Sequence, residues 1–221
     1  MDYERLKTRH RTERGPWHPN LSLRVHRALS WLHRAEQLGK AEDTDGQFIL
    51  LWIAFNAAYA TEIDERFRLS EQETFRGFLA KLVELDGQGR IAELVWTEFP
   101  KGIRLLLNNQ YVFQDFWHFK NGSLSEEEWK RRFAGAKKAA NAALAALAAR
   151  DTVTVLSIVL SRIYVLRNQL VHGGATWGSS VNREQLRDCT HFMAKLVPLV
   201  IEVMMDHPET LWGEGCYPVV K

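Results

Sequence analysis

The chain has 221 residues, 46% of them hydrophobic, and its 29 Lys and Arg residues against 27 Asp and Glu residues give a formal net charge of +2. This composition is typical of a globular protein that buries a sizeable core, and it excludes a disordered chain. A charge so close to balance does not by itself indicate a nucleic-acid-binding protein.

Three features of the sequence predict a soluble, cytoplasmic protein without a membrane partner. The two cysteines, Cys189 and Cys216, form no CxxC pair, so we expect neither a disulfide framework nor a zinc site. The N-terminus is charged from its second residue, unlike a signal peptide. The apolar stretches 153–171 and 192–205 are interrupted by charged residues and fall short of the ~18 uninterrupted apolar residues of a membrane span.

Basic residues are concentrated at the start of the chain. The first 34 positions hold eight Lys and Arg residues against three acidic residues, together with four of the eight histidines. We therefore expect residues 1–19 to be a basic N-terminal arm that either lies along phosphate groups or forms a solvated, mobile terminus. These histidines have no carboxylate at metal-ligand spacing, so no metal site is expected.

Apolar residues recur at helical spacing through most of the chain, whereas no segment alternates as a β-strand does. The residues 110–120 hold five aromatic side chains, which can stack on RNA bases but more often belong to a core. The sequence predicts an all-α up-and-down bundle at 20–207, with an inserted helical region at about 90–150 and a C-terminal tail, 208–221, docked on the core. Helices are expected at 20–39, 45–63, 70–85, 91–98, 103–108, 126–150, 151–172 and 182–206, with an interruption at Pro100 and Gly102.

The helix expected at 151–172 carries a polar group in otherwise apolar surroundings. Arg167 has apolar residues at the neighbouring helical positions on both sides, and a permanent charge there is costly unless an anion or a hydrogen-bonding group meets it. Asn168 shares a helical face with Tyr164 and His172. His172 comes just before Gly173-Gly174, a pair that should end the helix. The sequence therefore places an arginine, an amide and a histidine near one helix tip.

The string Arg167-Asn168-Gln169-Leu170-Val171-His172 resembles the Arg-polar-x-x-x-His motif of HEPN domains, which are helical domains of RNA-processing proteins and toxins. The segment Trp52–Tyr59 is similar to the aromatic-Asn helix of standalone bacterial members. The resemblance spans about residues 20–205 and implies a HEPN-like bundle. It also implies a composite site at a dimer interface, no metal and no cofactor, products with 2′,3′-cyclic phosphate ends and, in some systems, a nucleotidyltransferase antitoxin as partner.

Within this resemblance, Arg167, Asn168 and His172 are the expected catalytic residues. Tyr164 and Asn56 are expected either to bind substrate or to support the catalytic residues without touching substrate. An asparagine on an apolar helix face is more often a satisfied buried amide than a catalytic group, so the role of Asn56 is open at this point.

The chemistry of these residue types fits metal-independent RNA cleavage. RNA is cleaved when its 2′-hydroxyl attacks the adjacent phosphorus, a step that needs a proton acceptor, a proton donor and positive charge on the phosphorane. Histidine exchanges protons near neutral pH, and arginine binds phosphate oxygens bidentately. One chain supplies one histidine here, so we expect a homodimer to complete the site.

The expected function is an endoribonuclease that acts on RNA, as a toxin or defence factor. The alternative is a non-catalytic helical module that binds RNA or a protein partner. In that case Arg167 and His172 would serve an interface or an internal network.

Overall fold

The computed structural model describes residues 2–59, 71–145, 151–180 and 182–213. All regular structure in these ranges is helical, with no strand, so the predicted all-α class is confirmed. None of the helices described is both long enough and apolar enough to span a bilayer. Parts of three expected features, the helix end at 60–63, the helix start at Ser70 and the helix end at 146–150, lie outside the described residues.

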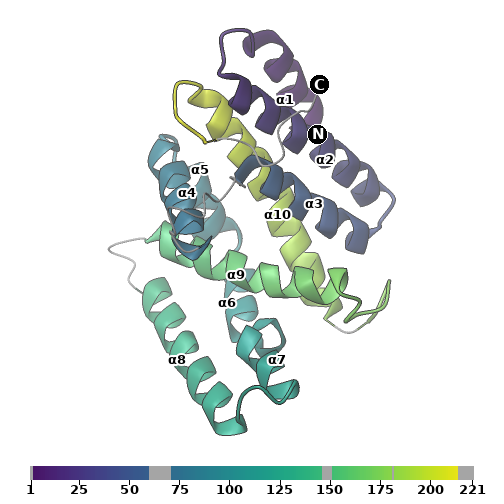
Figure 1. Cartoon of the computed structure of the whole chain (residues 1–221), viewed down its shortest axis with the longest axis vertical. Helices are drawn as coiled ribbons and strands as arrows, with labels where there is room; N and C mark the ends of the chain where they lie inside the picture. The colour runs from purple at the N-terminus through teal and green to yellow at the C-terminus, as the bar shows by residue number, and fades with distance from the viewer. Residues whose placement is uncertain (1, 60–70, 146–150, 181, 214–221) are drawn as a thin grey trace. The chain divides into compact units, whose positions relative to one another are not determined.

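The chain forms two compact units (Figure 1). Unit 1 comprises residues 1–91 and 190–221, and unit 2 comprises residues 92–189. Most of the inserted region expected at about 90–150 therefore belongs to unit 2. That unit also contains the helix with the Arg-Asn-x-x-x-His motif.

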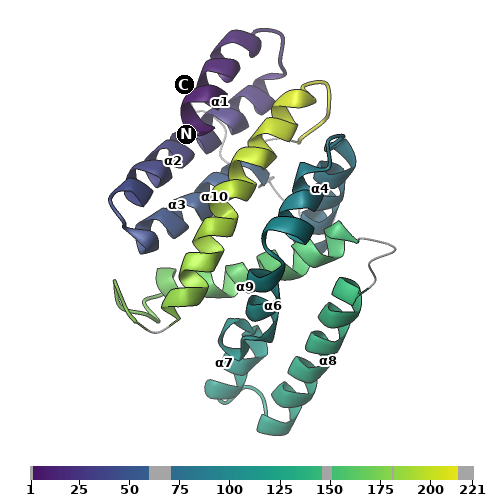
Figure 2. The ribbon, with the colours of Figure 1, turned by 180° about the vertical axis from the view of Figure 1, so that it is seen from behind.

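Unit 1 is built around the packing of α2 against α3, with α1 packed on α2. Apolar residues at helical spacing on α2, such as Leu21, Val25 and Leu32, are buried, as the sequence pattern predicts. Its helices are α1 (Asp2–Glu13), α2 (Pro19–Lys40), α3 (Thr44–Tyr59), α4 (Glu71–Leu85) and the greater part of α10 (Arg183–Asp206), which Figure 2 shows from behind.

The N-terminal segment is a docked helix and not the mobile terminus considered from the sequence. Leu6 and His10 of α1 are fully buried. Arg5 forms an ion pair with Glu202 of α10, and Arg9 of α1 pairs with Asp206 of α10 across 2.6 Å. A short helix with few apolar residues is thus held by ion pairs to residues nearly 200 positions away in sequence. The sequence pattern of residues 2–13 alone therefore does not predict this helix.

The chain after α10 returns to α4 within unit 1. The ring of Trp212 is buried, its Nε1 donates a hydrogen bond to the carbonyl of His207 over 3.0 Å, and its centroid lies 6.2 Å from that of Phe78. Lys81 of α4 donates to the carbonyl of Leu211 over 2.8 Å. Residues 214–221 of the expected docking tail lie outside the described residues.

Unit 2 begins where α5 (Arg90–Glu93) continues into a π-helical turn, η1 (Leu94–Glu98). The interruption expected at Pro100 and Gly102 falls at Phe99, between η1 and the next helix. Pro100 begins that helix, because the first helical position needs no N–H donor, and Gly102 lies within it. The remaining elements are α6 (Pro100–Asn108), a 3-10 turn η2 (Gln110–Val112), α7 (Gln114–Lys120), α8 (Glu126–Ala145), α9 (Thr152–Val171) and the first residues of α10.

Aromatic rings fill the space between α7 and α8. Phe116 lies 5.3 Å from Trp129, and Phe113 lies 5.3 Å from Phe133, measured between ring centroids. Phe116 is buried in this cluster, Phe113, Trp117 and Phe119 are half-buried, and Tyr111 is 44% exposed. Apolar packing of this kind fixes the position of η2 against α9, and α9 carries the motif.

Candidate functional site

Helix α9 presents the motif at its carboxyl end. The helix begins after Asp151, whose side chain accepts a hydrogen bond from the backbone N–H of Thr154 over 2.9 Å, as an N-cap does. One side of the helix, including Val159, Leu160 and Ile163, is fully buried. The core contacts of these residues fix the rotation of α9, and thereby determine which side its later residues present.

The last turn of α9 closes in a Schellman motif around Gly173 and Gly174. Gly173 donates to the carbonyl of Leu170 over 3.2 Å, and Gly174 donates to that of Gln169 over 2.7 Å. Gly173 has φ of +71°, in the left-handed region that glycine adopts at no steric cost. The prediction that the Gly pair ends this helix is confirmed, and His172 is its C-cap residue.

Arg167, Asn168 and Tyr164 form one group of contacts. Nη1 of Arg167 donates a hydrogen bond to Oδ1 of Asn168 over 2.8 Å, and the guanidinium carbon lies 5.4 Å from the centroid of the Tyr164 ring. Arg167 and Asn168 are half-buried, and Tyr164 is 43% exposed. The amide and the ring therefore hold the guanidinium at the surface of α9, where an anion can reach it.

His172 is not part of this group. Its side chain is exposed, and its imidazole makes no hydrogen bond or ion pair with the described residues. Arg167 and His172 are five positions apart, a spacing that turns them about 140° away from each other on an ideal helix. One copy of the chain thus joins three of the expected site residues of α9 and leaves the histidine facing solvent.

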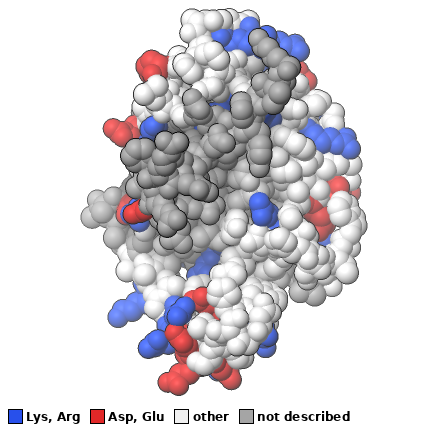
Figure 3. Space-filling view, in the orientation of Figure 1, with Lys and Arg blue, Asp and Glu red and all other residues white. Residues whose placement is uncertain are grey.

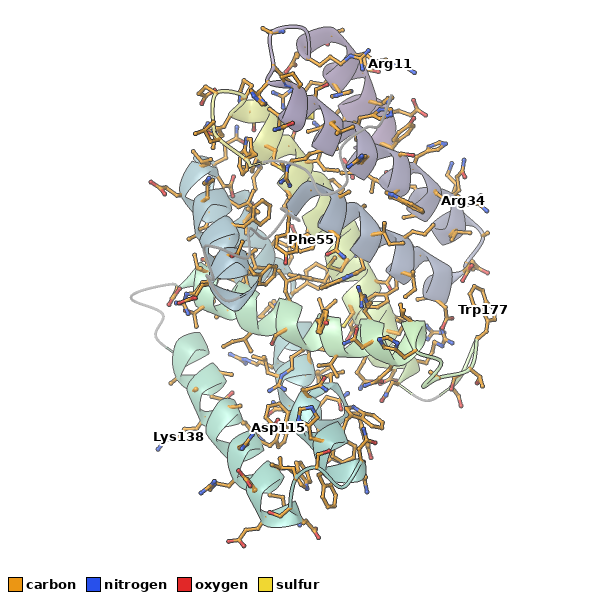
Figure 4. All side chains as sticks on the ribbon, viewed as in Figure 1. Arg11, Arg34, Phe55, Asp115, Lys138 and Trp177 are labelled. Atoms are coloured by element: carbon orange, nitrogen blue, oxygen red, sulfur yellow. The ribbon has the colours of Figure 1, made fainter. Side chains whose placement is uncertain are left out.

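Exposed apolar side chains lie before, within and after the motif in sequence. Tyr164 and Val171, which lie three positions before and four after Arg167, are 43% and 52% exposed. Trp177, in the loop after the Gly pair, is 72% exposed, and Figure 4 shows it projecting away from the ribbon. Large apolar groups exposed together around polar ones are typical of a surface that meets another molecule. Trp177 was missed from the sequence, although a tryptophan between turn residues directly after the motif was a usable signal.

The opposite side of α9 makes structural contacts. Nε2 of Gln169 donates to the carbonyl of Tyr111 over 2.6 Å, and the same carbonyl accepts a hydrogen bond from Nε1 of Trp117 over 2.8 Å. Arg162, seven positions before Gln169, stacks its guanidinium 4.3 Å from the centroid of Phe113. Gln169 and Arg162 on this side of α9 thus contact the segment that contains η2 and α7.

The remaining candidate, Asn56, belongs to unit 1, where it is half-buried on α3. Its supporting role stays a prediction. The ranges that the structure describes contain no group of three or more His, Cys, Asp and Glu side chains arranged to hold a metal ion. Comparisons of the chain with protein-family models, with curated proteins and with solved structures found no match.

Proposed function

We propose that this chain is a HEPN-like, metal-independent endoribonuclease whose site forms when two copies pair around the carboxyl ends of their α9 helices. The observation that carries the proposal is the arrangement at that end. Arg167 is held at the surface by Asn168 and Tyr164, and an exposed histidine follows at the helix tip. Cleavage of a phosphodiester by its own 2′-hydroxyl requires a cation to bind the phosphate and a group to carry protons. An oriented guanidinium and a nearby imidazole are groups of these two kinds.

Each residue has a distinct role in this proposal. Arg167 binds the non-bridging phosphate oxygens and stabilises the negative charge that develops on them. Asn168 orients the guanidinium. The imidazole of His172 takes the proton of the 2′-hydroxyl in one copy, and the imidazole of the second copy protonates the leaving 5′-oxygen. The products are a 2′,3′-cyclic phosphate and a 5′-hydroxyl.

The need for a second copy follows from the contacts within one copy. A single chain places one exposed histidine at this helix tip, whereas in-line displacement needs proton carriers on opposite sides of the phosphorus. The exposed Tyr164 and Val171 supply apolar surface for a symmetric, self-complementary contact.

The test uses a defined RNA in the presence of EDTA, with analysis of the product ends. Wild type should release 2′,3′-cyclic phosphates, and His172→Ala should release none while its circular dichroism spectrum and Tm are unchanged. His118→Ala is the matched control, because His118 is another exposed histidine of unit 2. Intact RNA after incubation with wild type contradicts the nuclease. A chain that sediments as a monomer and still cleaves contradicts the shared site.

A non-catalytic module that binds RNA or protein is the second candidate. It is favoured by one observation: Arg167 is bonded within its own helix, and His172 takes no part in that group. In this case His172→Ala weakens dimerisation or lowers stability, RNA stays uncleaved, and binding persists. For the nuclease, a role as toxin or defence factor predicts that expression slows growth and that His172→Ala abolishes this effect.

A further inference from the structure

A cluster of basic side chains lies where α1 ends beside α2. It consists of Lys7, Arg11 and Arg14, together with His26 of α2, and is called the α1–α2 basic patch below. Nζ of Lys7 lies 3.3 Å from Nδ1 of His26. Figure 3 shows Lys and Arg side chains at the end of unit 1 formed by α1 and α2, and Figure 4 labels Arg11 there.

The patch contrasts with the other basic residues of the same helix. Arg5 and Arg9 are neutralised by Glu202 and Asp206 of α10. In the part of the chain that the structure describes, Lys7, Arg11 and Arg14 pair with no carboxylate. Helix α1 therefore has one basic side whose charges are neutralised within the described residues and another, continued by Arg14, whose charges are not.

The basic groups of the patch lie close enough to repel one another. Burial lowers the pKa of Lys7, and the charges of Arg11 and Arg14 lower it further. Burial also lowers the pKa of His26, and the charges of Lys7 and Arg14 lower it further. Holding like charges together costs free energy in the isolated protein, and a polyanion that binds across them removes that cost.

We propose that the α1–α2 basic patch binds the sugar–phosphate backbone of RNA, at a surface separate from the motif of unit 2. Lys7, Arg11 and Arg14 follow one another at spacings of four and three, which lines them up along one side of α1 and its end. Such a row matches successive phosphate groups, and arginine binds each one bidentately. The choice of RNA as the polyanion rests on the proposed function, whereas the surface itself does not.

The surroundings of the patch favour a nucleic acid over an anionic membrane. A helix that lies on a membrane inserts exposed apolar side chains beside its basic ones. Leu6 on α1 is fully buried, and Trp17 in the following loop is 8% exposed. Among the described residues 2–27 no large apolar side chain is exposed. The patch therefore has basic side chains, but residues 2–27 expose no large apolar side chain that could insert into a membrane.

The experiment measures the Kd of a short single-stranded 2′-O-methyl RNA, which cannot be cleaved, over a series of salt concentrations. The patch variant carries Lys7→Gln, Arg11→Gln and Arg14→Gln. The control variant carries Lys40→Gln, Lys137→Gln and Lys138→Gln, which remove the same charge at exposed lysines elsewhere. We expect the slope of log K against log salt to shrink by about 2 in the patch variant, at about 0.7 per lost phosphate contact, and to stay unchanged in the control.

Each outcome supports or overturns the proposal. Equal slopes for wild type and the patch variant overturn it, as does an equal loss in the control. Absence of RNA binding by wild type, or binding only to phosphatidylserine vesicles, overturns it too.

If the triple variant fails to fold, the double variant Arg11→Gln/Arg14→Gln changes exposed residues only and should reduce the slope by about 1.4. Cleavage of ordinary RNA with an unaffected slope refutes the patch alone. A patch-dependent slope without cleavage refutes the nuclease alone.

Discussion

The guanidinium of Arg167 donates a hydrogen bond to the side-chain oxygen of Asn168, its neighbour in sequence, over 2.8 Å. Adjacent residues on a helix point about 100° apart, so the arginine bends across the surface of α9 to reach the amide. The Tyr164 ring lies 5.4 Å from the guanidinium carbon. Asn168 thus positions the side chain of Arg167.

The first prediction is that Asn168→Ala lowers kcat for RNA cleavage about 10²-fold, because a mobile guanidinium stabilises the phosphorane poorly. The Tm should change little, since this part-buried hydrogen bond joins two neighbours in sequence and contributes about 1 kcal/mol at most. Single-turnover cleavage assays and thermal unfolding measure the two effects. Equal kcat in Asn168→Ala and wild type would show that the amide does not position the arginine.

Gln169→Ala is the matched control for this prediction. Gln169 is next in sequence, but its amide holds the carbonyl of Tyr111 on the opposite side of α9. We expect it to lower the free energy of unfolding by about 1 kcal/mol and to leave kcat unchanged. The pair of variants therefore separates the side of α9 that is proposed to act on substrate from the side that contacts η2.

A second prediction concerns Gly173, whose φ of +71° closes α9 directly after His172. Gly173→Val should lower the free energy of unfolding by about 1–2 kcal/mol, and cleavage should fall as well because the C-cap histidine is displaced. Gly173→Asn should cost less, since asparagine tolerates the left-handed region. Urea unfolding and cleavage assays on both variants are the measurement. An equal cost for valine and asparagine would contradict a role for the left-handed backbone.

The sequence predicted α9 well because its signals are local. The side chain of Asp151 accepts a hydrogen bond from the N–H of the residue three positions later. The N–H groups of Gly173 and Gly174 donate to carbonyls three and five positions earlier. The spacing of the Arg and His residues alone is a weaker signal than these local contacts. Arg5 and His10 repeat the five-residue spacing of Arg167 and His172, yet Arg5 pairs with Glu202 and His10 is buried.

Features that depend on distant partners were not predictable from the pattern. Arg24 is 1% exposed and donates to the carbonyls of Ala58 and Gly213, which lie 34 and 189 positions away. The docking of α1 likewise depends on acids of α10. The sequence cannot name the acceptors of such a buried arginine, because only the fold brings these carbonyls next to it.

A third prediction concerns Arg162, which is 5% exposed and whose buried Nε has no hydrogen-bond partner among the described residues. Burial lowers the pKa of Arg162 to about 10, although the charge of Asp115 opposes this shift. Arg162→Met keeps the apolar stem and removes the desolvated charge, so the free energy of unfolding should rise by about 1 kcal/mol. Arg162→Lys should lower it, because the stacking on Phe113 is lost. Urea unfolding checks both. A large loss in Arg162→Met would reveal a charge partner that these contacts do not include.

The last prediction follows from His10 of α1, which is fully buried. Its Nε2 lies 3.2 Å from the carbonyl of Ser22, so Nε2 carries the proton in the neutral ring. Nδ1 is buried and has no hydrogen-bond partner in the part of the chain that the structure describes. A second proton on Nδ1 would be a buried donor with no acceptor. Burial, together with the nearby charges of Lys7 and Arg14, accordingly lowers the pKa of His10 from its ordinary 6.5 to about 4.

Because the folded state binds this proton less readily than the unfolded state, the contribution of His10 to stability is complete above pH 6.5 and is lost as the pH falls toward 4. The free energy of unfolding should fall by up to about 3 kcal/mol across that window. His10→Leu cannot be protonated and should show a flatter profile, whereas His118→Ala, which removes an exposed histidine, should follow wild type. Urea unfolding at a series of pH values makes the comparison. Parallel profiles for wild type and His10→Leu would mean that His10 is not the group whose protonation loosens α1.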